Sequence, residues 1–138
     1  VRGGLCCRAE CGGFLYLHKT LWDDRGNSYP MVGAVDAEAK PTGSLKRFGY
    51  VKLTAKQDNL LCKKGESFPA HEFHYWDSTD SGDGFHAEKA GGKRSWECAV
   101  ATDSFYAGYP HFHFCSEPRL AQSFLEKCAA YRDSRCEI

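Results

Sequence analysis

The chain has 138 residues, the size of one globular domain, and a folded chain of this length buries about 70% of the surface that it exposes when unfolded. Eighteen Lys and Arg balance eighteen Asp and Glu, so the formal net charge of 0 gives no electrostatic support for binding nucleic acid or an anionic membrane. Hydrophobic residues make up 42% of the chain, which excludes a disordered protein, and no apolar run approaches the roughly 20 residues of a membrane span. We therefore expect one soluble domain with neither a nucleic-acid nor a membrane partner.

The eight cysteines are spread unevenly along the chain. Cys6, Cys7 and Cys11 form a cluster and the others are scattered, unlike the regular disulfide framework of a small secreted protein. No basic segment followed by an apolar segment and a cleavage site opens the chain, so nothing indicates secretion. We therefore expect a cytoplasmic protein with reduced thiols. Because the chain starts at Val1 rather than at Met, we also expect it to be part of something longer.

The N-terminal part predicts a strand, a tight turn and a helix. Residues 5–9 are apolar, Gly12 and Gly13 allow unusual backbone angles, and apolar side chains over residues 14–21 recur at the spacing of one helix face. Residues 22–30 are rich in Asp, Gly and Asn and predict a loop, and residues 31–35 predict a short strand.

The rest of the chain predicts antiparallel hairpins followed by a helix. Alternating or aromatic stretches indicate strands at residues 45–54, 59–62, 71–76, 96–102 and 105–114, and a loop rich in Ser, Asp and Gly at residues 78–94. Leu120, Phe124 and Cys128 form an i,i+4 row of a helix that has Pro118 near its start and Ser116 as a candidate cap. We expect residues 132–138 to fray.

Cys11 is the first candidate for chemistry. A thiol between a strand and a helix N-terminus lies near unpaired backbone N–H groups, which favour the thiolate. The N–H of Gly12 is then placed to stabilise an oxyanion, as in the strained elbow of other hydrolases. The alternative is a small buried cysteine that only packs at a tight turn.

A catalytic cysteine needs a base, and the sequence has six histidines. His111 and His113 share one face of a strand, as a base and a companion, whereas His71 and His74 point to opposite faces. For each of them, a hydrogen-bonded ring in an aromatic core is the alternative. Neither H-E-x-x-H nor C-x-x-C spacing occurs, so a zinc module, a third hypothesis, would have to use His111, His113 and distant thiols. No phosphate-loop motif is present.

Four blocks in order resemble one family: AECGGFLYL at residues 9–17, FGYV at 48–51, HEFHY at 71–75 and AGYPHFHF at 107–114. From about Leu5 to its end, the chain resembles the glutamine amidotransferase domain of the cobyrinic (or hydrogenobyrinic) acid a,c-diamide synthase family. The resemblance implies an α/β fold, a partial class I amidotransferase-like (flavodoxin-like) domain with a nucleophile elbow, an antiparallel strand section and a C-terminal helix. Residues 1–138 would be the C-terminal portion of that domain.

The same resemblance implies roles for individual residues. Cys11 matches the nucleophile that attacks the side-chain amide of glutamine and forms a thioester, and His111 matches its base. Gly12 and Gly13 match the oxyanion and glutamine-binding positions, and His113 is a second candidate histidine. Because His113 stands where many class I relatives have Glu, we expect a Cys-His dyad rather than a triad.

The resemblance also implies partners outside this chain. The ammonia released from glutamine would serve the ATP-dependent amidation of the a and c carboxylates of a corrin in cobalamin biosynthesis. We expect Mg-ATP and the corrin to bind an N-terminal domain that is absent here. The start of the amidotransferase domain is expected to be absent as well. We expect this chain itself to bind no cofactor or metal. A homodimer is left open. The alternative function is a catalytically inactive folded fragment that only binds a partner.

Overall fold

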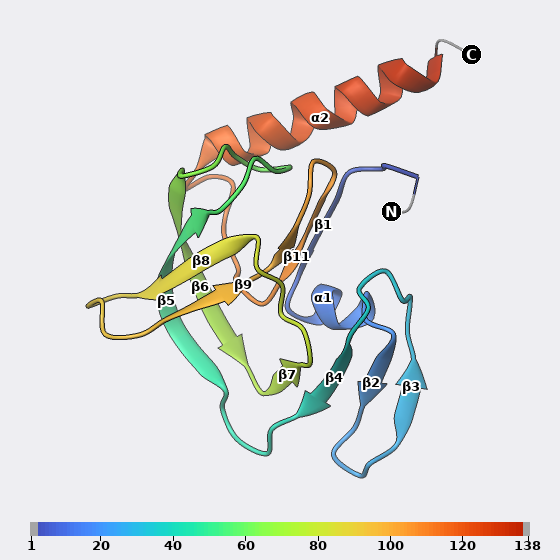
Figure 1. The fold of residues 1–138 in the computed structure, drawn as a ribbon, viewed down its shortest axis with the longest axis vertical. Helices are drawn as coiled ribbons and strands as arrows, with labels where there is room; N and C mark the ends of the chain where they lie inside the picture. The colour runs from blue at the N-terminus through green and yellow to red at the C-terminus, as the bar shows by residue number, and fades with distance from the viewer. Residues whose placement is uncertain (1–2, 137–138) are drawn as a thin grey trace.

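The computed structural model describes residues 3–136, which form mixed sheets and two helices (Figure 1). The α/β class and the C-terminal helix predicted from the sequence are confirmed within this part of the chain. In chain order the elements are β1 (Cys7–Glu10), α1 (Gly12–Tyr16), β2 (Thr20–Trp22), β3 (Ser28–Pro30), β4 (Glu38–Pro41), β5 (Arg47–Ala55), β6 (Ser67–His74), β7 (Trp76–Ser78), β8 (Phe85–Lys89), β9 (Ser95–Cys98), β10 (Val100–Ala101), β11 (Phe105–Gly108) and α2 (Pro118–Cys136).

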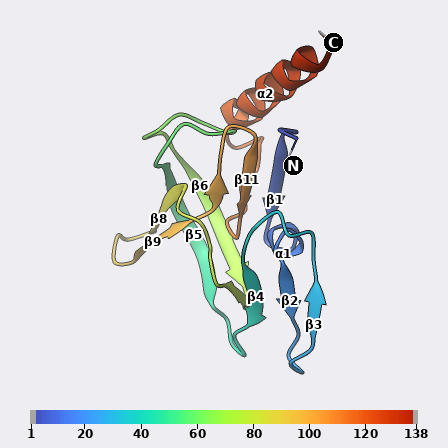
Figure 2. The same cartoon turned by 45° about the vertical axis from the view of Figure 1, so that its right-hand side comes forward.

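The small sheet β1-β11-β10 lies at the centre of the hydrophobic core, and Figure 2 shows β1 and β11 side by side. These two strands are parallel, with Glu10 opposite Gly108. Along β11, Phe105 and Ala107 pack into one buried cluster and Tyr106 into the other. Such burial on both faces is typical of a parallel strand covered on two sides. Since parallel strands end at the same edge, the segments that follow β1 and β11 are neighbours.

The sheet β6-β5-β8-β9 supplies half of the buried residues of the larger cluster and confirms the predicted antiparallel section. Along β5, Val51 and Leu53 are buried against the core, whereas Phe48 and Tyr50 are exposed on the outer face. This period of two is the alternation seen in the sequence. The hairpin of β5 and β6 therefore has an apolar inner face and an aromatic outer face.

The sequence predictions for residues 14–35 are wrong in part. The helix is only α1, because the chain turns at Leu17, whose N–H donates to the Phe14 carbonyl, and residues 20–22 then form β2. The predicted loop at 22–30 contains β3, paired with β2 through a turn whose N–H groups donate to the Asp23 carboxylate. Residues 31–35 are not a strand, and β4 forms further along, parallel to β2.

Five other predictions differ from the structure. Residues 59–62 are not a strand, because the Asn59 side chain accepts the N–H groups of Leu61 and Cys62 in a local turn. The predicted loop at 78–94 contains β8, which pairs with both β5 and β9. The predicted strands at 71–76, 96–102 and 105–114 each end early or divide, the second at Ala99, which has φ 61°.

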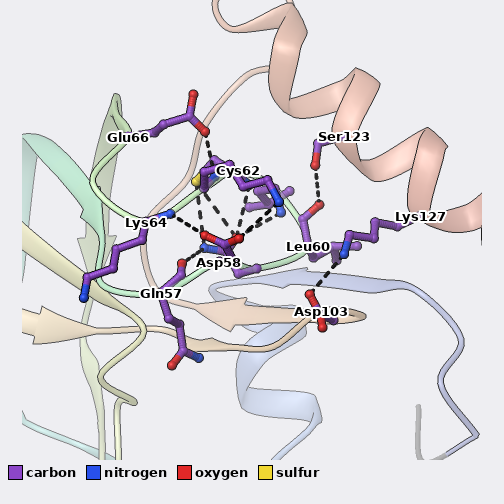
Figure 3. Close-up of polar contacts among 12 residues, drawn as sticks. Gln57, Asp58, Leu60, Cys62, Lys64, Glu66, Asp103, Ser123 and Lys127 are labelled. Atoms are coloured by element: carbon purple, nitrogen blue, oxygen red, sulfur yellow. Dashed lines mark hydrogen bonds and ion pairs between the residues drawn. The ribbon is translucent and has the colours of Figure 1, made fainter.

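Helix α2 crosses one end of the domain and is fastened to two loops (Figure 3). The Ser123 hydroxyl donates to the Leu60 carbonyl at 3.0 Å, and Lys127 pairs with Asp103 at 3.0 Å. The Ser116 hydroxyl donates to the His113 carbonyl. Residues 132–136 continue the helix, so the predicted fraying there is wrong, and residues 137 and 138 lie outside the described residues. Within the described part of the chain, no helix has the length and apolar character to cross a membrane.

Candidate functional site

Cys11 occupies the turn between β1 and α1. Its backbone has φ 48° and ψ −109°, a region that side chains other than glycine rarely adopt. The turn is held from both sides, since the Cys11 N–H donates to the Gly108 carbonyl and the Cys11 carbonyl accepts the N–H of Leu15, both at 2.9 Å. Beside it, the Gly12 Cα faces open space and Gly13 packs near Ala9. The thiol is therefore presented at the carboxyl edge of β1 and β11.

A cavity of about 520 Å³ opens over this turn. It is lined by Cys11, Phe48, His71, Phe73 and His111. The thiol lies 4.0 Å from the Phe73 carbonyl oxygen. The structure thus brings together Cys11 and His111, which the sequence proposed as nucleophile and base. Aromatic side chains from the β5–β6 hairpin form the other wall.

His113 lies beside this cavity rather than in it. The cavity that it lines measures about 550 Å³ and also contacts His71, His111 and Glu10. The His113 ring is exposed and its Nδ1 accepts the N–H of Cys115 at 3.2 Å. His111 is therefore the histidine of the pair that shares a cavity with the thiol.

The HEFHY segment alternates between the cavity and the core. His71 and Phe73 line the cavity, whereas Glu72 and His74 are buried on the other face of β6, so the predicted opposite orientation of His71 and His74 is confirmed. The backbones of His71 and His111 exchange two hydrogen bonds of 2.8 Å in an antiparallel bridge. This bridge fixes the segment that carries His111 against β6.

The buried half of the segment supports the site from behind. The His74 ring stacks on Tyr109 with centroids 3.7 Å apart, and its Nδ1 bonds the Trp76 carbonyl at 2.7 Å. Glu72 accepts the indole N–H of Trp96 at 3.3 Å and lies 3.6 Å from Arg47. These contacts anchor the chain just before Pro110 and His111, so this half of the segment packs in the interior.

A charged network of Arg8 and Glu10 contacts His111. Glu10 Oε2 is 3.6 Å from His111 Nδ1. Glu10 Oε1 accepts the Nε–H of Arg8 at 2.8 Å and also contacts the Arg8 Nη2 group, which donates to the Phe112 carbonyl at 2.6 Å. Glu117, the other acidic residue near this segment in sequence, pairs instead with Arg119 at 3.2 Å. Glu10 is therefore the acidic side chain that the structure places at the imidazole.

The surroundings of Cys11 raise the pKa of its thiol. Burial is the largest cause, the nearby Glu10 carboxylate adds to it, and a hydrogen bond from the Gly12 backbone N–H acts in the opposite direction. The Gly12 N–H favours the thiolate, as expected of a donor at this turn, but desolvation outweighs it and the pKa of the Cys11 thiol is raised. The thiol needs a neighbouring base to lose its proton.

Among the described residues, the Cys6 thiol contacts that of Cys128, and the other cysteines and histidines outside the cavities around His111 form no metal-binding cluster. The pKa values of the Cys62 and Cys98 thiols are raised mainly by burial, as expected of packed cysteines. Among the described side chains, no group of three or more His, Cys, Asp or Glu is arranged to hold a metal ion. The zinc hypothesis built on His111 and His113 therefore has no third ligand within residues 3–136.

Sequence reasoning missed Glu10, Arg8, Phe48 and Phe73 as parts of this site. The adjacency of Glu10 to Cys11 was visible, but its contact with His111 depends on the parallel pairing of β1 with β11. Phe48 and Phe73 face each other across β5 and β6, and only the antiparallel register places that pair beside Cys11.

The chain is similar to known proteins over most of its length. Residues 1–119 match the CobB/CobQ-like glutamine amidotransferase domain. Three proteins named cobyrinate a,c-diamide synthase are similar: that of Caldanaerobacter subterraneus subsp. tengcongensis, 35% identical over 95% of this chain; that of a Synechococcus species, 35% identical over 93%; and that of Sulfolobus acidocaldarius, 37% identical over 87%. The matched region covers only 28% or 29% of the length of these relatives.

Proposed function

The chain belongs to the family of CobB/CobQ-like glutamine amidotransferase domains, and we propose that it hydrolyses glutamine to glutamate and ammonia at the cavity of Cys11 and His111. One observation carries this proposal: the thiol, in a strained strand-to-helix turn, and the imidazole line the same cavity. We read the turn as a nucleophile elbow, since a positive φ at a cysteine between a strand and a helix exposes the sulfur above the sheet edge.

In the proposed reaction, His111 takes the proton of the Cys11 thiol as the sulfur attacks the side-chain carbonyl carbon of glutamine. The tetrahedral adduct collapses as its C–N bond breaks, and the protonated imidazole returns that proton to the leaving nitrogen, which departs as ammonia. Water then attacks the glutamyl thioester. The C–S bond breaks, glutamate leaves with the hydroxyl group of the water, and the thiol regains its proton from that water.

The Gly12 and Gly13 turn is suited to the negative charge of the adduct. The Gly12 N–H already lies within hydrogen-bonding reach of the sulfur, and open space at the Gly12 Cα leaves room for a ligand. A backbone donor next to the nucleophile stabilises an oxyanion more than the neutral carbonyl, which lowers the barrier rather than tightening substrate binding. The aromatic wall of Phe48 and Phe73 would exclude water around the amide.

The use of the ammonia is a wider proposal. The relatives are named cobyrinate a,c-diamide synthases, so we propose that the ammonia serves ATP-dependent amidation of the a and c carboxylates of a corrin. The residues of this chain do not fit Mg-ATP: the sequence has no G-x-x-x-x-G-K-[ST] loop, and the described part has no cluster of acidic side chains suited to a cation. The proposal therefore assigns no ATP-dependent step to these residues.

The glutaminase proposal is tested by labelling the purified chain with diazo-oxo-norleucine, a glutamine-like electrophile, followed by peptide mass spectrometry. We expect modification at Cys11 and none at Cys128, and slower labelling in His111→Ala. The matched control is His86→Ala, which removes an exposed imidazole that pairs with Glu97 at 2.9 Å. Equal labelling of several cysteines that is indifferent to His111→Ala would contradict a formed glutaminase site.

A second candidate is a folded piece that is inactive and only binds a partner. It is favoured by the exposed aromatic side chains of β5, β6 and the residue after β6, since Phe48, Tyr50, Phe73 and Tyr75 have exposed fractions of 59%, 70%, 49% and 46%. Large exposed apolar patches mark interaction surfaces. The same labelling decides between the candidates, because selective reaction at Cys11 requires a formed site and a mere docking surface does not.

A further inference from the structure

We infer that Glu10 is the positioning residue of His111, so that the site is a triad whose acidic member directly precedes the nucleophile. The inference rests on the proposed glutaminase function. Glu10 Oε2 lies 3.6 Å from His111 Nδ1, within ion-pair distance and longer than a formed hydrogen bond. Hydrogen bonds of catalytic groups are commonly long before substrate binds. An acidic group at this nitrogen has the place that the carboxylate holds in a Ser-His-Asp arrangement.

The Glu10 carboxylate is divided between two partners. Oε1 accepts from Arg8, and Oε2 is left for the imidazole. Arg8 is itself fixed: its Nη2 donates to the Phe112 carbonyl at 2.6 Å, and its guanidinium lies 4.1 Å and 4.3 Å from the ring centroids of Phe112 and Phe114. Because Arg8 and Glu10 are two apart on β1, both side chains point to the same face. Arg8 therefore fixes the direction in which Glu10 presents its second oxygen.

His111 needs such a partner because its ring is 43% exposed. The bridge to His71 and the preceding Pro110 fix the main chain of His111, but main-chain bonds do not choose which ring nitrogen carries the proton. A carboxylate at Nδ1 holds the proton there and leaves the lone pair of Nε2 free to accept from the thiol. The opposite tautomer would present Nε2–H to the thiol and could not act as a base.

Glutamine in place of Glu10 makes the sharpest test. Its amide oxygen would remain with Arg8, which has only donors, so its NH₂ group would face His111 Nδ1 and donate to it. We therefore expect the neutral imidazole to change from the Nδ1–H to the Nε2–H tautomer in Glu10→Gln. Nitrogen-15 long-range NMR of labelled histidines distinguishes the two tautomers directly. We expect the wild-type His111 to be Nδ1–H.

Kinetics give the second readout. We expect Glu10→Gln to lower kcat for glutamine hydrolysis by about 100-fold, the lower end of what general acid–base catalysis contributes, with little change in KM. Glu10→Asp keeps the carboxylate and should retain the Nδ1–H tautomer. The matched control is Glu88→Gln, which breaks a surface pair with Lys52. Near-wild-type thermal unfolding of each variant shows that the fold is kept.

The outcomes separate the inference from the function on which it rests. An Nε2–H tautomer in the wild-type chain overturns the inference whether or not any variant folds. Unchanged turnover and an unchanged tautomer in Glu10→Gln, with Cys11→Ala inactive, overturn the inference alone. Undiminished glutamine hydrolysis by Cys11→Ala overturns the proposed function itself. If the wild-type chain shows no turnover, the tautomer still decides the role of Glu10.

Discussion

The strained backbone at Cys11 makes a prediction about stability that does not depend on catalysis. With φ 48° and ψ −109°, this position suits glycine better than any residue with a Cβ atom. Cys11→Ala and Cys11→Gly both remove the sulfur, but only glycine also removes the steric strain. We therefore expect Cys11→Gly to be the more stable of the two, although glycine in place of alanine usually destabilises a protein.

The expected difference follows from two opposing terms. A residue with a side chain in such a sparsely populated region costs about 1–3 kcal/mol, and glycine loses about 0.5–1 kcal/mol more than alanine in backbone entropy on folding. The net advantage of Cys11→Gly is then about 1 kcal/mol. For a domain of this size, that corresponds to a rise in Tm of about 3–5 °C.

Urea denaturation of the two variants measures this difference, with Ala130→Gly as the control. Ala130 is exposed within α2, where the same replacement should lower the free energy of unfolding by about 1 kcal/mol. The two comparisons therefore have opposite signs. If Cys11→Ala is as stable as Cys11→Gly or more so, the turn at Cys11 stores no strain and its interpretation as a nucleophile elbow loses its physical basis.

Two further predictions concern the core. Burial raises the pKa of the Cys62 thiol from 9.0 to about 11, so between these pH values the unfolded state binds fewer protons than the folded state. The free energy of unfolding should therefore fall with rising pH more steeply in the wild type than in Cys62→Ala. Urea titrations at several pH values between 9 and 11 measure this difference. A Cβ atom on Gly108 would lie 2.8 Å from that of Ala99, so Gly108→Ala should lower the free energy of unfolding by about 1–3 kcal/mol. A Cβ atom on Gly12 would meet no atom within 4 Å, so Gly12→Ala should change that free energy by less than about 1 kcal/mol. Equal unfolding midpoints for the two variants would contradict the packing at Gly108.

The sequence predicted well those elements whose hydrophobic pattern lies within a single segment. The alternation in β5 and the i,i+4 rows of α2 are patterns within one segment, and both elements formed close to the expected residues. Strand β8 was missed because only Phe85 and Ala87 are buried, within a stretch rich in Gly and Asp. Its stability comes from pairing with β5 and β9, and no local pattern reports such distant partners.

The candidate site likewise combines residues that a local motif indicates with residues whose role depends on contacts between distant segments. Cys11 and the two glycines after it are a local motif, and the sequence indicated their chemistry directly. His111 and His113 were equivalent by spacing, and only their resemblance to a family ranked them. The structure separates them by contacts, since His111 has the bridge to His71 and the Glu10 carboxylate, while His113 is exposed. Both contacts of His111 join segments that are distant in the sequence.

The raised pKa of Cys11 explains why an oriented base matters at this site. Burial in the cavity disfavours the thiolate, and the charge of Glu10 disfavours it further, so Glu10 does not activate the sulfur directly. The same carboxylate favours the imidazolium that forms when His111 takes the thiol proton. Glu10 thus opposes a thiolate at rest yet stabilises the cation produced during attack. Substituting it should therefore affect turnover more than substrate binding.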